Sequence, residues 1–265
     1  MVIIERAKDP RLQELIGKCY TMKNGQVAKI IGGTLSKLQI EFIGQYPSTR
    51  ICTYSNLAKG LVKNYRYPNV YGIGYWGDGT YRKSNYAREY QVWADMLYRC
   101  STYYKVKYHN TYLNAHVSAE FADFSYFCKW ITSQNNYLQW KNGERWCLDK
   151  DIIGGKGNKE YSPKNCCLVP NNVNTLFVKK DKNRGDLPIG VMKNHNNYMA
   201  MCSNPIVSKR QYYLGTFSTP EMAFAAYKKC KEDIIKQIAD SEYANGNITK
   251  RCHDAMYQYE VEITD

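Results

Sequence analysis

The stretch CLDKDIIGGKGNKEYSPKNCCLVPNNVN, residues 147–174, decides how the middle of this chain folds. The alternation in WCLDKDII predicts a short strand with Asp149 and Asp151 on one face and Lys150 on the other. The glycine-rich run GGKGNK predicts a turn, so that a second strand can return beside the first. Two carboxylates are therefore expected next to one cation at the end of a hairpin.

The second half of the stretch predicts a short helix. Pro170 suits the opening of a helix because its φ angle is already fixed, and Asn171 is the expected cap. This helix would bring Asn174 back toward the first strand. A nuclease that uses one divalent metal needs an oxygen ligand on a strand, a neighbouring base, and a second ligand from the following helix. The stretch offers residues at all three kinds of position.

The 265 residues include 37 Lys and Arg against 24 Asp and Glu, a formal net charge of +13. This excess predicts a polyanionic partner, because each neutralised phosphate releases condensed counterions. Nucleic acid is the first candidate. An anionic membrane surface is the rival, but the sequence has no long apolar run and no signal-peptide core, so we expect a cytoplasmic protein without a membrane partner. The 10 cysteines form no C-x-x-C pair, and no zinc site is expected.

The other segments predict an α+β protein with three domains. The leading residues alternate like short strands, which favours a small twisted barrel or sheet in a β-barrel-like domain at 1–84. Helical spacing of aromatic residues predicts two amphipathic helices ahead of the hairpin, in a central helical and ββα domain at 85–182. Three short strands and a helix capped by Thr219 form the third predicted domain, at 186–265.

Aromatic residues recur beside cations and glycines before the central helices. KNYRYPNVYG, residues 63–72, would allow rings to stack on bases, but packed rings with hydroxyls at the surface are the simpler interpretation. VYGIGYWGDGTY, residues 70–81, lacks the third glycine and the helix of a dinucleotide fingerprint, so a structural crossover is expected. The aromatic residues at helical spacing are assigned to the core: Tyr90, Trp93, Phe121, Phe124, Phe127 and Trp130.

The segment WCLDKDI…GNKEYSPKNCCLVPNNVN resembles the HNH, or ββα-metal, fold of phage and intron homing endonucleases and of endonuclease VII. In that family an Asp-His pair ends the first strand, an Asn lies in the loop, and a final Asn or His lies on the helix. The resemblance implies that Asp149 and Asn174 are ligands of Mg²⁺ or Mn²⁺ and that Asn165 braces the loop.

Lys150 is the departure from the family pattern, because it stands where the family has its histidine base. A protonated lysine cannot accept a proton from water. Asp151, or a displaced histidine such as His109 or His116, would have to serve as the base. Otherwise the site binds metal weakly and cleaves slowly or not at all.

Residues 189–239 resemble the plant ethylene-response-factor DNA-binding domain, which is also appended to phage homing endonucleases, through IGV, NYMA and YLGTFSTPEMAFAAY. The resemblance implies that a three-stranded sheet lies in the major groove of double-stranded DNA. The first ninety residues also resemble the leading segment of phage HNH endonucleases. The candidate DNA-binding residues are Lys193, His195, Asn197, Tyr198, Lys209, Arg210 and Tyr212.

Two functions are therefore expected. The first is a phage-type HNH endonuclease or nickase, which hydrolyses a DNA phosphodiester in the cytoplasm of an infected cell at a site selected by the C-terminal domain. The alternative is a catalytically inactive descendant that binds DNA, or a host or phage protein, as a regulator or inhibitor. Lys150 favours the alternative.

Overall fold

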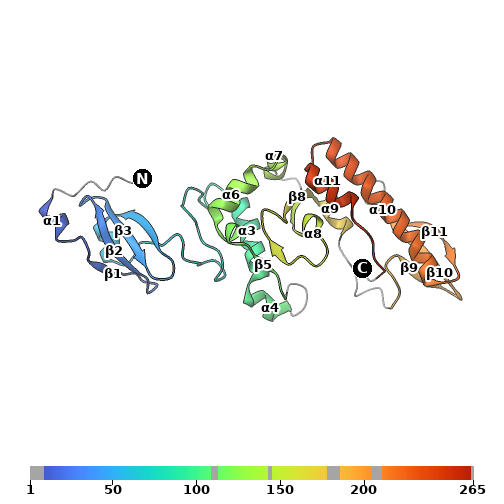
Figure 1. Cartoon of the computed structure of the whole chain (residues 1–265), viewed down its shortest axis with the longest axis horizontal. Helices are drawn as coiled ribbons and strands as arrows, with labels where there is room; N and C mark the ends of the chain where they lie inside the picture. Colours follow the sequence, from blue (N-terminus) through green and yellow to red (C-terminus); the bar gives the residue numbers. More distant parts are fainter. Residues whose placement is uncertain (1–8, 109–112, 143–144, 178–185, 205–210, 264–265) are drawn as a thin grey trace. The chain divides into compact units, whose positions relative to one another are not determined.

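The computed structural model describes residues 9–108, 113–142, 145–177, 186–204 and 211–263. The chain divides into two compact units, residues 1–109 with 119–128 and residues 110–118 with 129–265. Both helices and strands are present, which confirms the predicted α+β class (Figure 1). The partition into three domains stays a prediction. In the described part of the chain, no helix combines the length and the apolar character that a membrane crossing requires.

The first unit begins with an open four-stranded antiparallel sheet in the order β1-β2-β3-β4. Ile30, Ile40 and Phe42 alternate with more exposed residues and are buried against Leu12 and Leu57 from two short helices. Within the described residues the sheet does not close into a barrel, because the chain turns into a helix after β4 instead of pairing with β1. The elements are β1 (Cys19–Thr21), β2 (Val27–Gly33), β3 (Leu38–Ile43), β4 (Ser48–Cys52), α1 (Pro10–Gln13) and α2 (Tyr54–Ala58).

Helices rich in aromatic residues follow in the same unit. Trp93, Phe121, Phe124 and Phe127 are buried, which confirms their assignment to the core. The indole Nε1 of Trp93 donates to the carbonyl oxygen of Phe121 at 2.7 Å, so the largest of these side chains also has its polar atom satisfied. The helices are α3 (Ala87–Cys100), α4 (Thr102–Tyr108), α5 (Ala119–Ala122) and α6 (Phe124–Thr132), the last of which continues into the second unit.

The second unit contains the predicted hairpin and helix. β6 (Trp146–Asp149) pairs antiparallel with β8 (Cys167–Pro170), and α9 (Asn171–Leu176) begins directly after β8. Pro170 occupies the cap position and Asn171 is the first helical residue, so the predicted cap was one residue too late. The surrounding elements are α7 (Tyr137–Lys141), α8 (Asp151–Gly154) and the parallel pair of β5 (His116–Val117) with β7 (Glu160–Tyr161).

The last part of the second unit is a three-stranded sheet with a long helix along it (Figure 1). The Oγ1 atom of Thr219 accepts a hydrogen bond from Met222 N at 3.3 Å, which confirms the predicted cap. Val169 and Val173 share one hydrophobic core with Ala200 and Ile235, so the hairpin and the sheet are packed together. The elements are β9 (Val191–Asn194), β10 (Asn197–Ser203), β11 (Gln211–Phe217), α10 (Pro220–Ala244) and α11 (Lys250–Tyr257).

Candidate functional site

Asp149 ends strand β6, opposite Cys167 of β8. Its Oδ1 atom accepts hydrogen bonds from Asp151 N at 2.8 Å and from Ile152 N at 2.7 Å. Burial raises the pKa of Asp149, and the hydrogen bond from Ile152 N acts in the opposite direction. The carboxylate therefore has one oxygen occupied by the backbone, while Oδ2 accepts no hydrogen bond from the described residues.

Asp151 does not lie on the strand beside Asp149. It begins the short helix α8, because the two hydrogen bonds to Asp149 Oδ1 turn the backbone into a helical conformation directly after Lys150. The predicted face shared by Asp149 and Asp151 was therefore wrong.

Lys150 is buried, with 8% of its side chain exposed. Its ammonium group forms a short ion pair with Asp151 and donates to the carbonyl oxygen of Asn158 at 3.2 Å. The same nitrogen lies 5.6 Å from the centre of the Tyr161 ring. Lys150 thus acts as a hydrogen-bond donor inside the protein, and in this arrangement it has no lone pair with which to take a proton.

Asn165 lies in the connection between β6 and β8 and ties that connection together. Its amide nitrogen donates to Asn158 Oδ1 at 3.2 Å and to Glu160 Oε2 at 3.1 Å. Asn158 in turn donates to the carbonyl oxygens of Lys150 at 2.8 Å and Glu160 at 3.0 Å. We call Lys150, Asn158, Glu160 and Asn165 the loop cluster. Sequence reasoning missed Asn158 and Glu160, although GNKEY was within the stretch that it used.

His116 lies beside this cluster. Parallel pairing of β5 with β7 places His116 opposite Glu160, with 4.0 Å between His116 Nε2 and Glu160 Oε1. The Nδ1 atom of His116 is 3.1 Å from the carbonyl oxygen of Asn114, so Nδ1 is the donor and Nε2 is the acceptor in the neutral ring. Its side chain is 61% exposed. The other alternative base, His109, lies outside the described residues.

Asn174 is half-buried on α9, between the buried Val173 and Leu176. Helix α9 packs against β6 and β8. The Asn174 side chain makes no hydrogen bond with any residue that the structure describes. Asp149 Oδ2 and the amide oxygen of Asn174 are both oxygen atoms of the type that Mg²⁺ and Mn²⁺ take as ligands, and these ions also keep several waters. Among the described residues no group of three or more His, Cys, Asp or Glu side chains could hold a metal ion.

The predicted DNA-binding residues of the C-terminal sheet are divided between its two faces. Val191, Ala200 and Cys202 face α10 in the shared core. Lys193 pairs with Tyr198, and each is two residues along its strand from the buried pair Val191 and Ala200, so both belong to the face that packs on α10. Tyr212 pairs with Cys202 and belongs to that face as well. Three of the predicted DNA-binding residues therefore lie on the face of the sheet that α10 covers.

The opposite face of this sheet carries methionines and polar side chains. Met192 pairs with Met199, and Met201 pairs with Tyr213. Met192 and Tyr213 are 50% and 60% exposed. Of the predicted DNA-binding residues, Asn197 belongs to this face. His195 lies in the turn between β9 and β10, with a φ of 52°. Lys209 and Arg210 lie outside the described residues.

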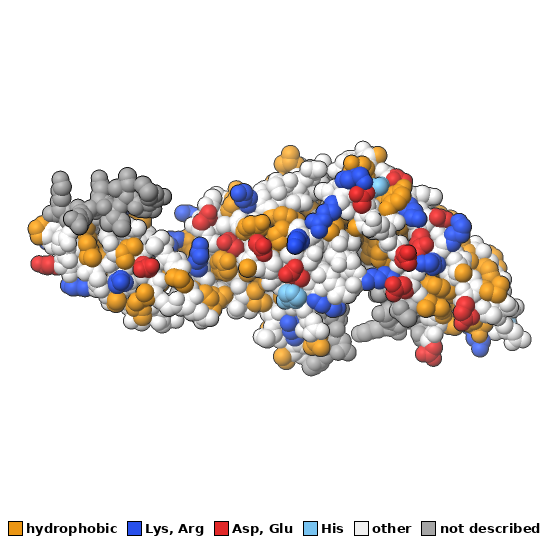
Figure 2. Space-filling view, in the orientation of Figure 1, with side chains coloured by type: hydrophobic (Ala, Val, Ile, Leu, Met, Phe, Trp, Pro, Cys, Tyr) orange, Lys and Arg blue, Asp and Glu red, His pale blue; other side chains and the backbone are white. Residues whose placement is uncertain are grey.

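Positive charge is spread out on the face of the molecule that Figure 2 draws. Figure 2 shows Lys and Arg side chains dispersed among acidic and hydrophobic ones on the visible face. The net charge of +13 consequently does not identify a binding surface by itself.

Protein-family models, curated proteins and solved structures were compared with this chain, and none of them matches it.

Proposed function

We propose that this chain is a metal-dependent DNA endonuclease or nickase of the HNH type. One observation carries the proposal: Asp149 ends β6, α9 with Asn174 directly follows β8, and Asn165 ties the connection between the two strands. A hairpin followed by a helix can present a carboxylate and an amide to the same cation. The packing of α9 against β6 supports this geometry.

In this proposal the ligands of Mg²⁺ or Mn²⁺ are Asp149 Oδ2 and the Asn174 amide oxygen. When bound, the ion would supply Lewis-acid polarisation of the scissile phosphate and neutralise charge on the leaving oxygen. Asn165 keeps the loop cluster in place beside the end of β6.

His116 is the proposed base, since Lys150 is engaged as a donor to Asp151 and Asn158. The Nε2 atom of His116 accepts a proton from water while the water oxygen forms a bond to phosphorus. The bond from phosphorus to one ester oxygen breaks, and that oxygen takes up a proton from solvent. The carbonyl oxygen of Asn114 accepts a hydrogen bond from Nδ1 and so orients the imidazole, while Glu160 Oε1 lies 4.0 Å from Nε2.

Cleavage of supercoiled plasmid tests the proposal. We expect nicked or linear DNA in Mg²⁺ or Mn²⁺ and intact plasmid in EDTA, as separated on agarose gels. His116→Gln should lower the cleavage rate by about a hundredfold or more. His253→Gln is the matched control, because His253 is held by Asp240 and Asp254 on α10 and α11, and its cleavage rate should equal that of the parent. Metal-independent cleavage, or equal loss in both variants, would contradict the proposal.

A second candidate function is a DNA-binding protein that does not cleave. The burial of Lys150 and its contacts with Asp151 and Asn158 favour it, because the position of the histidine base is filled by a fixed donor. This candidate predicts retarded DNA in gel-shift assays, no cleavage in either metal, and cleavage created by Lys150→His. Cleavage by the parent chain would exclude it.

A further inference from the structure

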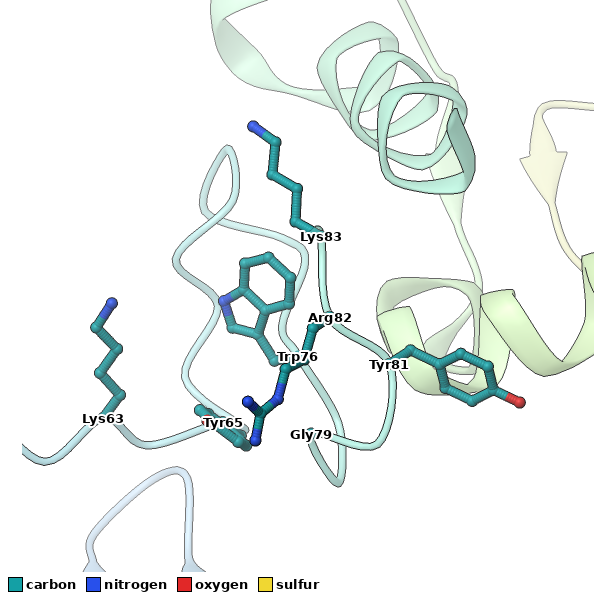
Figure 3. A pocket seen from close by; sticks show the side chains of 7 residues that line it. All are labelled: Lys63, Tyr65, Trp76, Gly79, Tyr81, Arg82 and Lys83. Atoms are coloured by element: carbon teal, nitrogen blue, oxygen red, sulfur yellow. The ribbon is translucent and has the colours of Figure 1, made fainter. Parts of the chain in front are cut away.

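A basic and aromatic pocket lies in the first unit, within residues 63–83 that connect α2 to α3 (Figure 3). It has a volume of about 200 Å³. This volume is below the range of roughly 300–1,000 Å³ that is usual for drug-sized ligands, so the pocket suits a single small ring system. We call it the aromatic pocket, and its lining residues are Lys63, Tyr65, Trp76, Gly79, Tyr81, Arg82 and Lys83.

The aromatic walls of the pocket are fixed by their neighbours. Trp76 stacks on Tyr90 with 5.5 Å between ring centroids and an interplanar angle of 7°, and it meets the edge of Phe124 at 5.4 Å. The backbone nitrogen of Trp76 donates to the carbonyl oxygen of Tyr65 at 2.9 Å, which ties the two walls together. The guanidinium of Arg50 lies 3.4 Å from the centre of the Tyr65 ring. The rings are therefore held in place before any ligand arrives.

Buried polar contacts hold the segments that carry these rings. Asn64 is buried, accepts a hydrogen bond from Ser48 Oγ at 2.7 Å, and donates to the carbonyl oxygen of Tyr46 at 2.8 Å. Ser125 Oγ is 2.8 Å from both the carbonyl oxygen of Trp76 and Asp78 Oδ1. Asp78 also accepts a hydrogen bond from Thr80 N at 2.8 Å, which lowers the pKa of its carboxyl. Asp78, the acidic residue nearest in sequence to the pocket, is thus already engaged in hydrogen bonds with Thr80 and Ser125.

Gly79 brings the chain close to the Tyr65 wall of the pocket. Gly79 has a φ of 79°, and a Cβ atom there would lie 2.2 Å from the Tyr65 ring. The chain therefore approaches this ring more closely than any residue with a Cβ atom would allow.

The cations of the pocket are exposed and carry no carboxylate partner. Lys63, Arg82 and Lys83 form no ion pair with any residue that the structure describes, and Lys83 Nζ lies 4.5 Å from the centre of the Tyr90 ring. In the view of Figure 3, Trp76 is drawn between the side chains of Lys63 and Lys83, and Arg82 and Tyr65 line the same pocket. No Asp or Glu lines the pocket. An anionic ligand with a flat ring would match both the rings and the charges.

We propose that the aromatic pocket binds one unpaired nucleotide of a DNA strand, with its base against Trp76 and Tyr65 and its phosphates on Lys63 and Arg82. The choice of DNA rests on the proposed function, whereas the nucleotide chemistry rests on the pocket. A base pair inside a duplex is too large and too well stacked to enter, so the pocket selects a displaced or single-stranded segment. A free nucleotide has the same chemistry, and the test distinguishes it from a strand.

Binding is measured in EDTA, so the result does not depend on cleavage. The probe is a fluorescently labelled twelve-nucleotide oligo(dT), titrated with the full chain and followed by anisotropy. The double variant Lys63→Glu, Arg82→Glu should bind about tenfold more weakly or worse than the parent. The matched control is Lys23→Glu, Lys37→Glu, which changes the charge equally at exposed turns of the same unit outside the pocket and should change the affinity by less than about twofold.

Three further arms complete the experiment. A 5-iododeoxyuridine oligonucleotide, irradiated in the complex, should cross-link to a peptide that contains Tyr65, Trp76 or Tyr81. A duplex of the same length should bind more weakly than the single strand, and dTMP should compete only at far higher concentration. Equal loss in the two double variants, cross-links elsewhere, a preference for duplex, or competition by dTMP as strong as by the strand would each overturn the proposal. The plasmid assay remains a separate test of nuclease activity.

Discussion

In the first unit, Lys63, Arg82 and Lys83 surround the rings of the aromatic pocket and form no ion pair with the described residues. In the second unit, Lys150 is buried, and its charge is neutralised by Asp151 and shared with the Asn158 carbonyl oxygen. Cations of the same formal charge therefore have different uses. A buried and paired cation is already engaged within the fold and its removal leaves its partners unpaired, whereas exposed cations beside fixed rings remain available to a ligand.

The largest expected effect is on Asp149, the carboxylate that both the fold and the proposed metal site use. Asp149→Asn keeps an oxygen for the hydrogen bonds from Asp151 N and Ile152 N but removes the charge. Cleavage should fall by about a hundredfold or more, since a metal ligand is worth several kcal/mol to the transition state. Plasmid cleavage in Mg²⁺ measures this. Undiminished cleavage would remove Asp149 from the site.

The same variant should be at least as stable as the parent. Burial raises the pKa of Asp149, so the stabilisation that comes from its neutral form is lost as pH rises through that pKa. The charged form therefore costs stability at neutral pH, and the neutral amide removes that cost. We expect the free energy of unfolding in urea to rise by about 1 kcal/mol at neutral pH. A large loss of stability would show that the charge itself holds α8.

A pair of lysine variants sharpens the comparison between the units. Lys150→Ala should lower the free energy of unfolding by about 1–3 kcal/mol, because it leaves the Asn158 carbonyl and Asp151 without their donor. Lys63→Ala should change it by less than about 0.5 kcal/mol, because Lys63 is exposed. Urea denaturation of both variants measures the difference. An equal loss of unfolding free energy in the two variants would contradict the assignment of Lys150 to the fold and of Lys63 to a free surface.

A smaller effect is expected at Asn165. Asn165→Ala removes hydrogen bonds to Asn158 and Glu160 and should cost about 1–2 kcal/mol of unfolding free energy. Amide hydrogen exchange should increase in residues 150–166 and stay unchanged in the first unit. Asn172→Ala, which breaks a hydrogen bond to Glu242 instead, is the control and should leave exchange in that loop unchanged. Uniform changes in both variants would argue against a local brace.

The smallest expected effect is a pH dependence at His253. Hydrogen bonds to Asp240 and Asp254 raise its pKa, while Lys250 acts in the opposite direction. A raised pKa gives stabilisation that is complete below the unfolded pKa of about 6.5 and is lost as pH rises through the folded pKa. The melting temperature of the parent should therefore decrease more than that of His253→Gln between about pH 6 and about pH 8. Parallel curves would show that His253 contributes nothing in this window.

Local signals were sufficient to predict the hairpin and its helix. The glycines after Ile153 and the proline at 170 set the turn and the start of α9. The alternation did not predict the position of Asp151. The Asp149 side chain accepts hydrogen bonds from the two backbone nitrogens of Asp151 and Ile152, and this local contact ends the strand and begins α8. The contact between Glu160 and His116 was also missed, since it forms only through pairing of β7 with the distant strand β5.

Alternation correctly predicted the three C-terminal strands but did not reveal which face is covered. Val191 and Ala200 alternate with Met192 and Met199, so both faces have apolar members. The position of α10 decides between them, and that position depends on packing across the whole sheet. Lys193 and Tyr198 were for this reason assigned to an open face although their side of the sheet carries the helix.

The core that joins the hairpin to α10 has a consequence for synthesis on the ribosome. Val169 and Val173 are buried in a cluster completed by Ile235 and Met256, and Asn172 Nδ2 donates to Glu242 at 3.0 Å. Translation proceeds at about 5–20 residues per second, so the hairpin emerges several seconds before the helices that cover it. During that interval the nascent segment exposes its apolar side, and Asp149 and Asn174 are not yet held by a finished core. Any cleavage by this chain would consequently begin only after α10 and α11 have left the exit tunnel.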